Sequence, residues 1–257
     1  MKSVPAIYAV RMDQHSIQEN HELIARWSAA VPLERALRVA RFRHWEDQWR
    51  SLAGDILVRH VLREKYKLQA QQMIFAQNAF KKPMLHGNDV QYNVSHSGVW
   101  TVAAFHSAEI GIDVERIGKA DMLLAQAMFS RSEYDALCSR PVHERDRMFY
   151  AIWTGKESYI KAVGKGLSMP LSAFSVVGTV SVGSSRMVGV CASDEDNSAL
   201  ASVPWLQLVA EDEQSEATSS NWHLRQYELD PDYMLTVCSA SSDWPARLIV
   251  LDAVQLD

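Results

Sequence analysis

The chain has 257 residues, a formal net charge of -5 and 47% hydrophobic residues, which is typical of a globular protein with a sizeable core. Its acidic balance argues against a protein that coats nucleic acid through bulk charge. Three cysteines without CxxC spacing predict neither a disulfide framework nor a zinc site, and no stretch approaches the ~20 apolar residues that span a bilayer. The apolar run at residues 6–10 is too short for a secretion signal. We therefore expect a cytoplasmic protein without a nucleic-acid or membrane partner.

The first part of the chain predicts a strand, a helical region and then a hairpin. Residues 6–10 favour a strand, and residues 20–50 favour helices that Pro32 interrupts or restarts. A further helix is expected over residues 55–68, a strand over 72–80 and a loop over 81–87. Apolar and polar residues then alternate up to the turn signal at Ser97-Gly98, so residues 89–105 predict a β-hairpin.

The second part predicts one strand, a helical region and several antiparallel strands. Residues 109–115 favour a strand, and residues 122–137 and 143–163 favour helices, the last of them ended by glycine. Strand-like segments follow between residues 174 and 240, separated by Ser- and acid-rich segments at 193–202 and 211–221 that we expect to be surface loops. Because strands and helices segregate along the chain, the expected fold class is α+β.

The strand at residues 109–115 carries two acids on one face. Asp113 and Glu115 are two residues apart, so a strand places both opposite its apolar face. Like charges on one face repel unless a cation or solvent separates them. The pair suits a hard divalent cation such as Mg²⁺, and oxygen ligands alone do not separate Mg²⁺ from Mn²⁺. The alternative interpretation is a solvated acidic pair.

The predicted helix over residues 143–163 contains the sequence WTGKESYIK. Glu157 and Lys161 have i,i+4 spacing, and an exposed pair of this kind is worth only ~0.3–0.5 kcal/mol. Trp153, one turn earlier on the same line, indicates that this line is not fully solvated. A carboxylate that is buried there would need a cation or hydrogen bonds.

The predicted hairpin contains Ser95 beside His96. Neighbouring residues of a strand point to opposite faces, and the chain has no GxSxG sequence, so a serine hydrolase is disfavoured. A histidine that meets a phosphate fits better, and the alternative is a turn histidine exposed to water. Arg35 and Arg38 are three residues apart on a predicted helix and suit a shared anion, or else belong to a solvated helix face.

These segments in this order resemble the 4′-phosphopantetheinyl transferases. The resemblance rests on FKKP, NVSHSG, IGIDVE, FSRSEY and FYAIWTGKESYIKAVGKGLSMPLSAFSV, and on RFRHWEDQWRSLAGDILVRHVL in the first half. It extends from about Ile7 to Pro245 and is greatest to the larger single-chain bacterial type associated with nonribosomal peptide synthetases, as in surfactin production. The resemblance implies two similar α+β halves, residues 1–105 and 106–257, with pseudo-twofold symmetry and coenzyme A in the cleft between them. It also implies a monomer, because one chain supplies the whole cleft.

The resemblance further implies a reaction and a site. Phosphopantetheine would move from coenzyme A to a serine of an apo peptidyl or acyl carrier protein, with release of 3′,5′-ADP. The implied metal ligands are Asp113, Glu115 and Glu157. The implied contacts with the coenzyme A phosphates come from Ser95 and His96, and Lys161 would neutralise the charge that develops toward the leaving ADP. Arg35, Arg38 and Ser51 would hold the 3′-phosphate, and Lys82 would lie near the adenine and ribose. Glu157 is also a candidate base for the carrier serine.

The chain departs from the family pattern at a few positions. Arg35 and Arg38 stand where lysines are frequent, Lys81 stands where a glycine commonly precedes KP, and Gly155 lies within the WTGKES helix. A mid-helix glycine is expected to cost ~1 kcal/mol relative to alanine. Two alternatives remain: a catalytically inactive module that binds coenzyme A or a carrier protein, and another metal-dependent phosphoryl transferase. The absence of a Walker A or kinase glycine loop weakens the second alternative.

Overall fold

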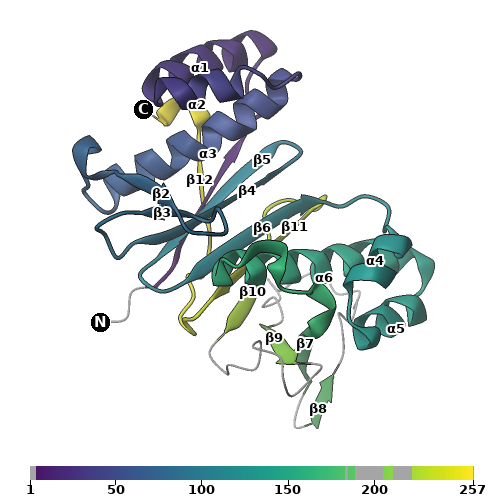
Figure 1. Cartoon of the computed structure of the whole chain (residues 1–257). Coiled ribbons are helices and arrows are strands. Elements are labelled where there is room, and N and C mark those ends of the chain that lie inside the picture. The colour runs from purple at the N-terminus through teal and green to yellow at the C-terminus, as the bar shows by residue number, and fades with distance from the viewer. Residues whose placement is uncertain (1–3, 183–184, 189–204, 211–221, 257) are drawn as a thin grey trace.

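The computed structural model describes residues 4–182, 185–188, 205–210 and 222–256, and it has an α+β fold of four layers. Helices α1–α3 cover one face of a four-stranded sheet, a six-stranded sheet packs against the other face, and helices α4–α6 follow (Figure 1). Each sheet therefore has helices on one side and the other sheet on its second side. None of the described helices is both long and apolar enough to cross a membrane.

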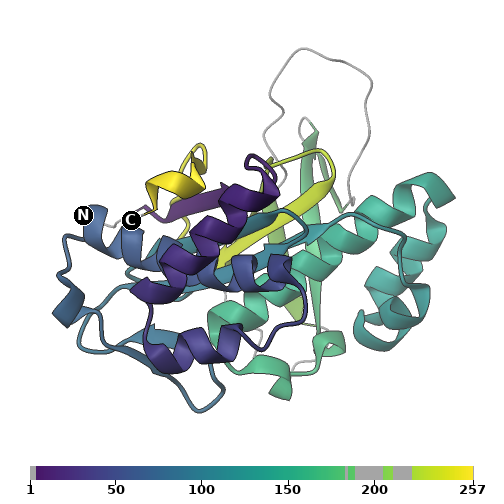
Figure 2. The same ribbon diagram turned by 90° about the horizontal axis from the view of Figure 1, so that it is seen from above.

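The first layers are built mainly from the first part of the chain. Figure 2 shows α1 and α3 lying over the first sheet. Pro32 directly precedes α2, which confirms that it starts a second helix, whereas β3 begins at Pro83 in a segment predicted to be a loop. The bounds are β1 Ala6–Arg11, α1 Ile17–Ala30, α2 Leu33–Val39, α3 Trp45–Glu64, β2 Phe75–Gln77, β3 Pro83–Leu85, β4 Gln91–Ser97 and β5 Trp100–His106.

The remaining layers follow the predicted order of one strand, helices and antiparallel strands. The bounds are β6 Ile110–Arg116, α4 Met122–Met128, α5 Arg131–Ser139, α6 Val142–Val163, β7 Phe174–Val182, β8 Ser185–Val188, β9 Trp205–Ala210, β10 His223–Tyr227, β11 Tyr233–Ser239 and β12 Ile249–Leu251. The strand order of the second sheet is β6-β11-β10-β9-β7-β8. The two acid-rich segments expected to be loops, 193–202 and 211–221, lie outside the described residues.

The end of the chain returns to the first sheet, across the predicted division at residues 1–105 and 106–257. Strand β12 pairs in parallel with β1, so the sheet order is β12-β1-β5-β4. Ala253 and Leu256 are buried in the core beneath α1 and α3. Residues 249–256 therefore pack with the first half. Strand β12 was not predicted because its three residues are too few to show a periodic pattern.

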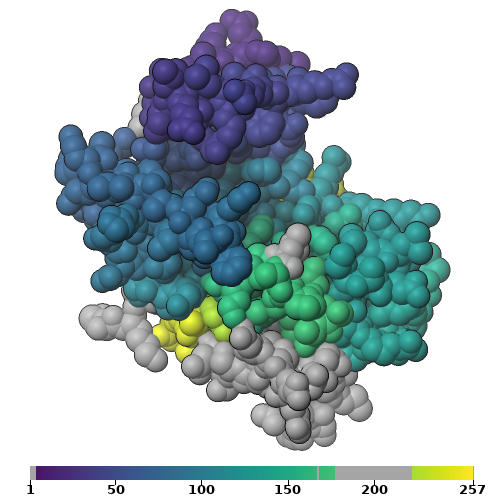
Figure 3. Space-filling view, in the orientation of Figure 1, coloured from purple at the N-terminus to yellow at the C-terminus, as the bar shows by residue number. Residues whose placement is uncertain are grey.

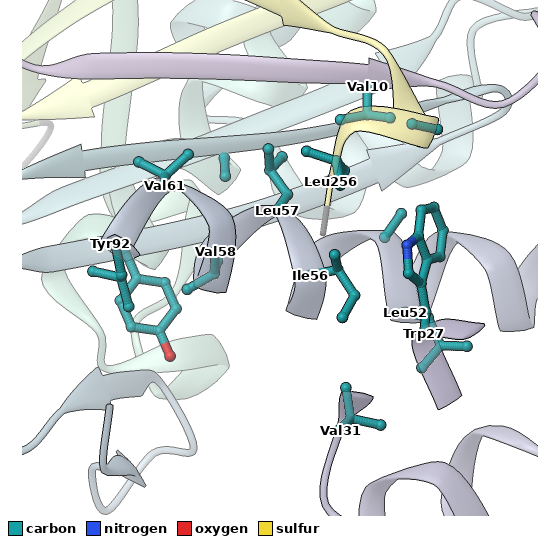
Figure 4. Packing of buried hydrophobic residues seen from close by; sticks show 14 of the residues in the cluster. Val10, Trp27, Val31, Leu52, Ile56, Leu57, Val58, Val61, Tyr92 and Leu256 are labelled. Atoms are coloured by element: carbon teal, nitrogen blue, oxygen red, sulfur yellow. The ribbon is translucent and has the colours of Figure 1, made fainter. Parts of the chain in front are cut away.

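The first core lies between the helices and the first sheet. Trp27 of α1 and Trp49 of α3 are both buried, with ring centroids 5.4 Å apart. Figure 4 shows side chains of α3, including Leu57 and Val61, pointing toward the sheet, with Leu256 of the chain end beside them. Burial of large apolar side chains on one face explains why residues 45–64 form a continuous helix.

The second core lies between the two sheets and fixes the direction of the acids on β6. Ile110, Ile112 and Val114 are fully buried against the first sheet. Because strand side chains alternate, Asp113 and Glu115 must point to the opposite face, toward α6. This confirms the alternation predicted from the sequence.

Helix α6 lies directly on β6, and a glycine makes this approach possible. A Cβ atom at Gly111 would lie 2.0 Å from the carbonyl oxygen of Ser158 and 2.4 Å from the backbone nitrogen of Ala162. No side chain fits in this space, so only glycine allows the contact. The contact sets how closely Glu157 and Lys161 approach the acids of β6.

The open edge of β6 is covered by side chains of β4. The backbone N–H groups of Ile112, Val114 and Arg116 donate to Asn93 Oδ1, Ser95 Oγ and Ser97 Oγ at 2.9, 3.4 and 3.0 Å. We call this set of contacts the β4–β6 ladder. The residue numbers rise together on both strands, so the strands run in parallel. The ladder satisfies the edge N–H groups of β6, of which those of Ile112 and Val114 would otherwise be buried without partners.

The buried rung of the β4–β6 ladder should matter most for stability. Asn93→Ala leaves the buried N–H of Ile112 without an acceptor, so we expect the free energy of unfolding to fall by about 1–3 kcal/mol. Ser97→Ala, at the exposed rung, lets water replace the lost acceptor and should cost less than about 1 kcal/mol. Urea denaturation of both variants measures the difference, and equal costs would contradict this account.

Gly155 within α6 also reflects packing. A Cβ atom there would lie 2.8 Å from Val176 Cγ1, so alanine is overpacked although its helix propensity is higher. We therefore expect Gly155→Ala to lower the free energy of unfolding by about 1–3 kcal/mol. The double variant Gly155→Ala/Val176→Ala should recover part of this loss relative to Val176→Ala alone. A stabilising Gly155→Ala would instead support the cost expected from propensity.

Candidate active site

A cavity of about 350 Å³ opens where β4, β6 and α6 meet. The two acids of β6 contribute to its wall, as do the side chains of α6 that the sequence predicted to share one face. Its lining residues are Val94, Ser95, His96, Asp113, Glu115, Trp153, Glu157 and Lys161. The structure thus brings together the predicted metal ligands, the Ser-His pair and the helix lysine.

Asp113 is the most deeply buried acid of this cavity, at 3% exposure. Its Oδ1 accepts hydrogen bonds from Lys161 Nζ at 2.6 Å and from Ser95 Oγ at 2.8 Å. Lys161 also donates to Ser95 Oγ at 3.0 Å. The hydroxyl of Ser95 is thus shared among the lysine, the aspartate and the β6 backbone. None of the hydrogen bonds of the described residues joins Ser95 Oγ to His96, so a serine nucleophile activated by His96 has no support.

Glu115 and Glu157 face the same cavity from two elements. Burial raises the pKa of Glu115, and the charge of Asp113 raises it further, whereas a hydrogen bond from Ser97 Oγ at 2.9 Å opposes the rise. Burial also raises the pKa of Glu157, again followed by the charge of Asp113. Two glutamates whose charged forms are disfavoured beside Asp113 form an environment that favours a cation.

His96 lies beside a second set of charges at the hairpin turn. Burial lowers the pKa of His96, and the nearby cations of Arg50 and Lys161 lower it further. Arg50 donates to the carbonyl oxygen of Gly98 at 2.7 Å and pairs with Asp47 at 2.5 Å. Arg50 of α3 therefore fixes the turn that follows His96.

A second cavity of about 230 Å³ adjoins the first and shares Glu157 and Lys161 with it. Lys82 lines this cavity, but its ammonium group donates to the carbonyl oxygens of Ala162 at 2.7 Å and Ile110 at 3.4 Å. Burial lowers the pKa of Lys82 to about 8. Lys81 has a φ angle of 67°, a left-handed conformation that glycine adopts most readily.

The arginines expected at the 3′-phosphate lie outside both cavities. Arg35 of α2 pairs with Asp55 Oδ2 at 2.5 Å and donates to Ser51 Oγ at 2.7 Å. Arg38 lies on the exposed side of the same helix. Arg35 and Ser51 are therefore neighbours, as the resemblance implies, and Asp55 is a partner that the sequence analysis did not identify.

A buried ion pair next to the site was also missed. Lys156 is fully buried, pairs with Glu133 at 2.7 Å and donates to the carbonyl oxygen of Leu171 at 2.7 Å. Glu133 accepts from the N–H of Ser130 and so completes the capping box of α5. The sequence held two signals for this pair: S-x-x-E before an apolar run, and a lysine four residues after Ile152 on the apolar side of α6.

The residues of the first cavity fit a hard divalent cation. Asp113 Oδ2 is buried and has no hydrogen-bond partner in the described structure, although Oδ1 has two. An unpaired buried carboxylate oxygen is costly unless a cation binds it. Across the described parts of the chain, no three His, Cys, Asp or Glu side chains already converge on one point. In the described structure the three carboxylates therefore line the cavity without forming a ready-made three-ligand site.

Comparison with known proteins gives the family. A model described as "4′-phosphopantetheinyl transferase, N-terminal" matches residues 18–108, and one described as "4′-phosphopantetheinyl transferase superfamily" matches residues 109–238. The chain is 33% identical over 251 residues to the 4′-phosphopantetheinyl transferase Sfp of Bacillus subtilis strain 168. The aligned region covers 97% of this chain and 99% of that protein.

Two other relatives cover different shares of the chain. It is 31% identical over 234 residues to 4′-phosphopantetheinyl transferase psf-1 of Bacillus pumilus, covering 91% of this chain and 89% of the relative. It is 29% identical over 156 residues to L-aminoadipate-semialdehyde dehydrogenase-phosphopantetheinyl transferase of Xenopus laevis, covering 55% and 52%. The two family matches and the identity over nearly the full chain show that the chain belongs to the 4′-phosphopantetheinyl transferases, enzymes that act with coenzyme A on carrier proteins.

Proposed function

We propose that the chain transfers 4′-phosphopantetheine from coenzyme A to a serine of an apo peptidyl or acyl carrier protein in a Mg²⁺-dependent reaction. The observation that carries the proposal is the first cavity, in which Asp113, Glu115, Glu157 and Lys161 surround one space. In the reaction, the serine oxygen forms a bond to the β-phosphorus of coenzyme A while the bond to the bridging oxygen breaks. The products are the holo carrier and 3′,5′-ADP, and the serine loses its proton to a base.

Asp113, Glu115 and Glu157 would hold the metal ion. When bound, Mg²⁺ neutralises phosphate charge and orients the pyrophosphate for phosphoryl transfer. The orphaned Oδ2 of Asp113 supports this assignment, as do the raised pKa values of Glu115 and Glu157. Mn²⁺ has the same ligand preferences, so the metal assignment covers both ions.

Lys161, Ser95 and His96 would bind the phosphates at the wall shared by β4 and α6. Lys161 is already held by Ser95 and Asp113, and its positive charge would stabilise the charge that develops toward the leaving group. Glu157 stands between the two cavities and is a candidate base for the carrier serine, directly or through a water molecule. One carboxylate does not fully serve the metal and the proton at once, so the water route suits a metal-bound Glu157.

The adenylate end of coenzyme A would extend beyond the second cavity toward α2 and α3. Arg35, Arg38 and Ser51 supply cations and a hydroxyl for the 3′-phosphate, which would replace Asp55 as the partner of Arg35. Lys82 would contribute to the adenine side through its backbone and stem, because its ammonium group is bound by two carbonyl oxygens. A monomeric state, a cytoplasmic location and service to nonribosomal peptide synthetases complete the proposal.

The reaction is tested by intact-mass spectrometry of carrier proteins. An apo peptidyl carrier and an apo acyl carrier are each incubated with the enzyme, coenzyme A and Mg²⁺, with EDTA as the metal-free control. We expect a gain of one phosphopantetheine mass that EDTA prevents and excess Mg²⁺ restores. No gain on either carrier, together with retained binding of coenzyme A, would favour the inactive binding module.

The metal assignment is tested at its most buried ligand. Asp113→Asn removes the ligand charge but keeps the side-chain shape, so we expect transfer to fall by about 10²-fold or more while the thermal midpoint stays near wild type. Asp135→Asn, on the exposed face of α5, is the matched control and should keep full activity. Near-normal turnover of Asp113→Asn at saturating Mg²⁺ would show that the metal is held elsewhere.

A further inference from the structure

A short loop of the first half grips the end of α6. This loop, residues 78–82, connects β2 to β3, and its backbone closes on itself through Asn78 N–H to Lys82 O and Lys81 N–H to Asn78 O, both 3.0 Å. Asn78 Oδ1 accepts from the N–H groups of Phe80 and Lys82, each at 2.9 Å. The loop is therefore fixed by its own hydrogen bonds before it touches α6.

The side chains of Asn78 and Lys82 extend from this loop to the second half of the chain. Asn78 Nδ2 donates to the carbonyl oxygen of Gly164 at 2.9 Å, and Lys82 Nζ donates to that of Ala162 at 2.7 Å. Lys82 also reaches Ile110 O at 3.4 Å, which ties the start of β6 to the end of α6. We call these three contacts the α6 clamp. In Figure 3 the blue surface of the first half meets the green surface of α6.

The carbonyl oxygens at a helix C-terminus have no partners within the helix and carry its negative dipole end. An ammonium group and an amide N–H are suitable donors for them. Contact is close as well, because a Cβ atom at Gly164 would lie 2.6 Å from Lys82 Cδ. The α6 clamp therefore fixes the last turn of α6 against the first half rather than merely covering it.

We propose that Asn78 and Lys82 are positioning residues, which act through the α6 clamp to hold Lys161 and Glu157 in place for phosphoryl transfer. Lys161 directly precedes Ala162, whose carbonyl oxygen the clamp binds, and Glu157 lies one helical turn before Lys161. The β4–β6 ladder fixes Ser95 and Asp113 on one side of the cavity, and the clamp fixes their partners on the other. This inference rests on the proposed function.

The test uses a substitution that removes the Asn78 contact of the clamp and leaves the two Lys82 contacts in place. Asn78→Asp keeps the oxygen that accepts from Phe80 and Lys82, but it has no N–H to donate to Gly164 O. Asn88→Asp is the matched control, because Asn88 Oδ1 also accepts a backbone N–H, that of Val90, at 2.9 Å and takes no part in the clamp. Both variants are half-buried and gain one negative charge.

Three measurements are made on the full chain. Steady-state transfer to a carrier gives kcat and KM for coenzyme A, hydrogen exchange reports on the amides of the last turn of α6, and thermal unfolding reports on the fold. We expect Asn78→Asp to lower kcat about tenfold or more with a smaller change in KM, since small misplacements of catalytic groups cost this much. Exchange at the end of α6 should accelerate in Asn78→Asp and not in Asn88→Asp.

The outcomes separate this inference from the proposed function. If wild type and Asn88→Asp transfer phosphopantetheine and Asn78→Asp matches them in kcat, the positioning role is overturned. If neither wild type nor Asn88→Asp transfers, the proposed function fails, and the exchange rates still decide whether the clamp holds α6. Should Asn78→Asp not fold, Lys82→Met and Lys82→Arg replace it, with rescue of kcat expected only for the arginine variant, which retains a donor for Ala162 O.

Discussion

The β4–β6 ladder is the interaction on which the site depends. Asn93, Ser95 and Ser97 accept the edge N–H groups of β6, and Ser95 and Ser97 then donate to Asp113 and Glu115. A single set of side chains therefore sets the register between the two halves and orients two acids of the cavity. A shift of β4 by one residue would place Tyr92, Val94 and His96 in this role, and Val94 has no side-chain acceptor for an edge N–H group of β6. Register and chemistry are coupled because the same hydroxyl groups serve both.

The position of α6 is the second constraint, and contacts at several points along the helix fix it. Gly111 lets the helix backbone approach β6, Gly155 makes room for Val176, and Lys82 with Asn78 holds the last turn. The buried pair of Lys156 with Glu133 connects the middle of the helix to α5 and to the start of β7. Glu157 and Lys161 thus sit on a helix that several neighbours fix, which suits groups that must meet phosphates and a cation without reorganising.

Much of the fold and of the site could be predicted from local patterns. Alternation along residues 110–115 gave the face of Asp113 and Glu115, and helical spacing gave the line of Trp153, Glu157 and Lys161; all five line one cavity. Three features of the structure have no local signal in the sequence. Strand β12 is too short to show a pattern, and the ion pair of Arg35 with Asp55 joins two different helices. The close contact of Gly155 with Val176 joins α6 to another element, so helix propensity alone did not predict the effect of an alanine there. Each of these depends on residues far apart in the chain.

By itself, the sequence determined the α+β class, the order of strands and helices, and which residue types were available for phosphate and metal chemistry, because periodicity and motif spacing are local properties. Only the tertiary structure decided which of those groups meet. It placed Lys161 against Asp113, and among the described residues it left Asp113 Oδ2 without a hydrogen-bond partner. It also bound the ammonium group of Lys82 to the end of α6 rather than leaving it free in the cavity. The reason is physical: a buried polar group takes the partner that packing brings within reach, and packing depends on contacts between distant parts of the chain.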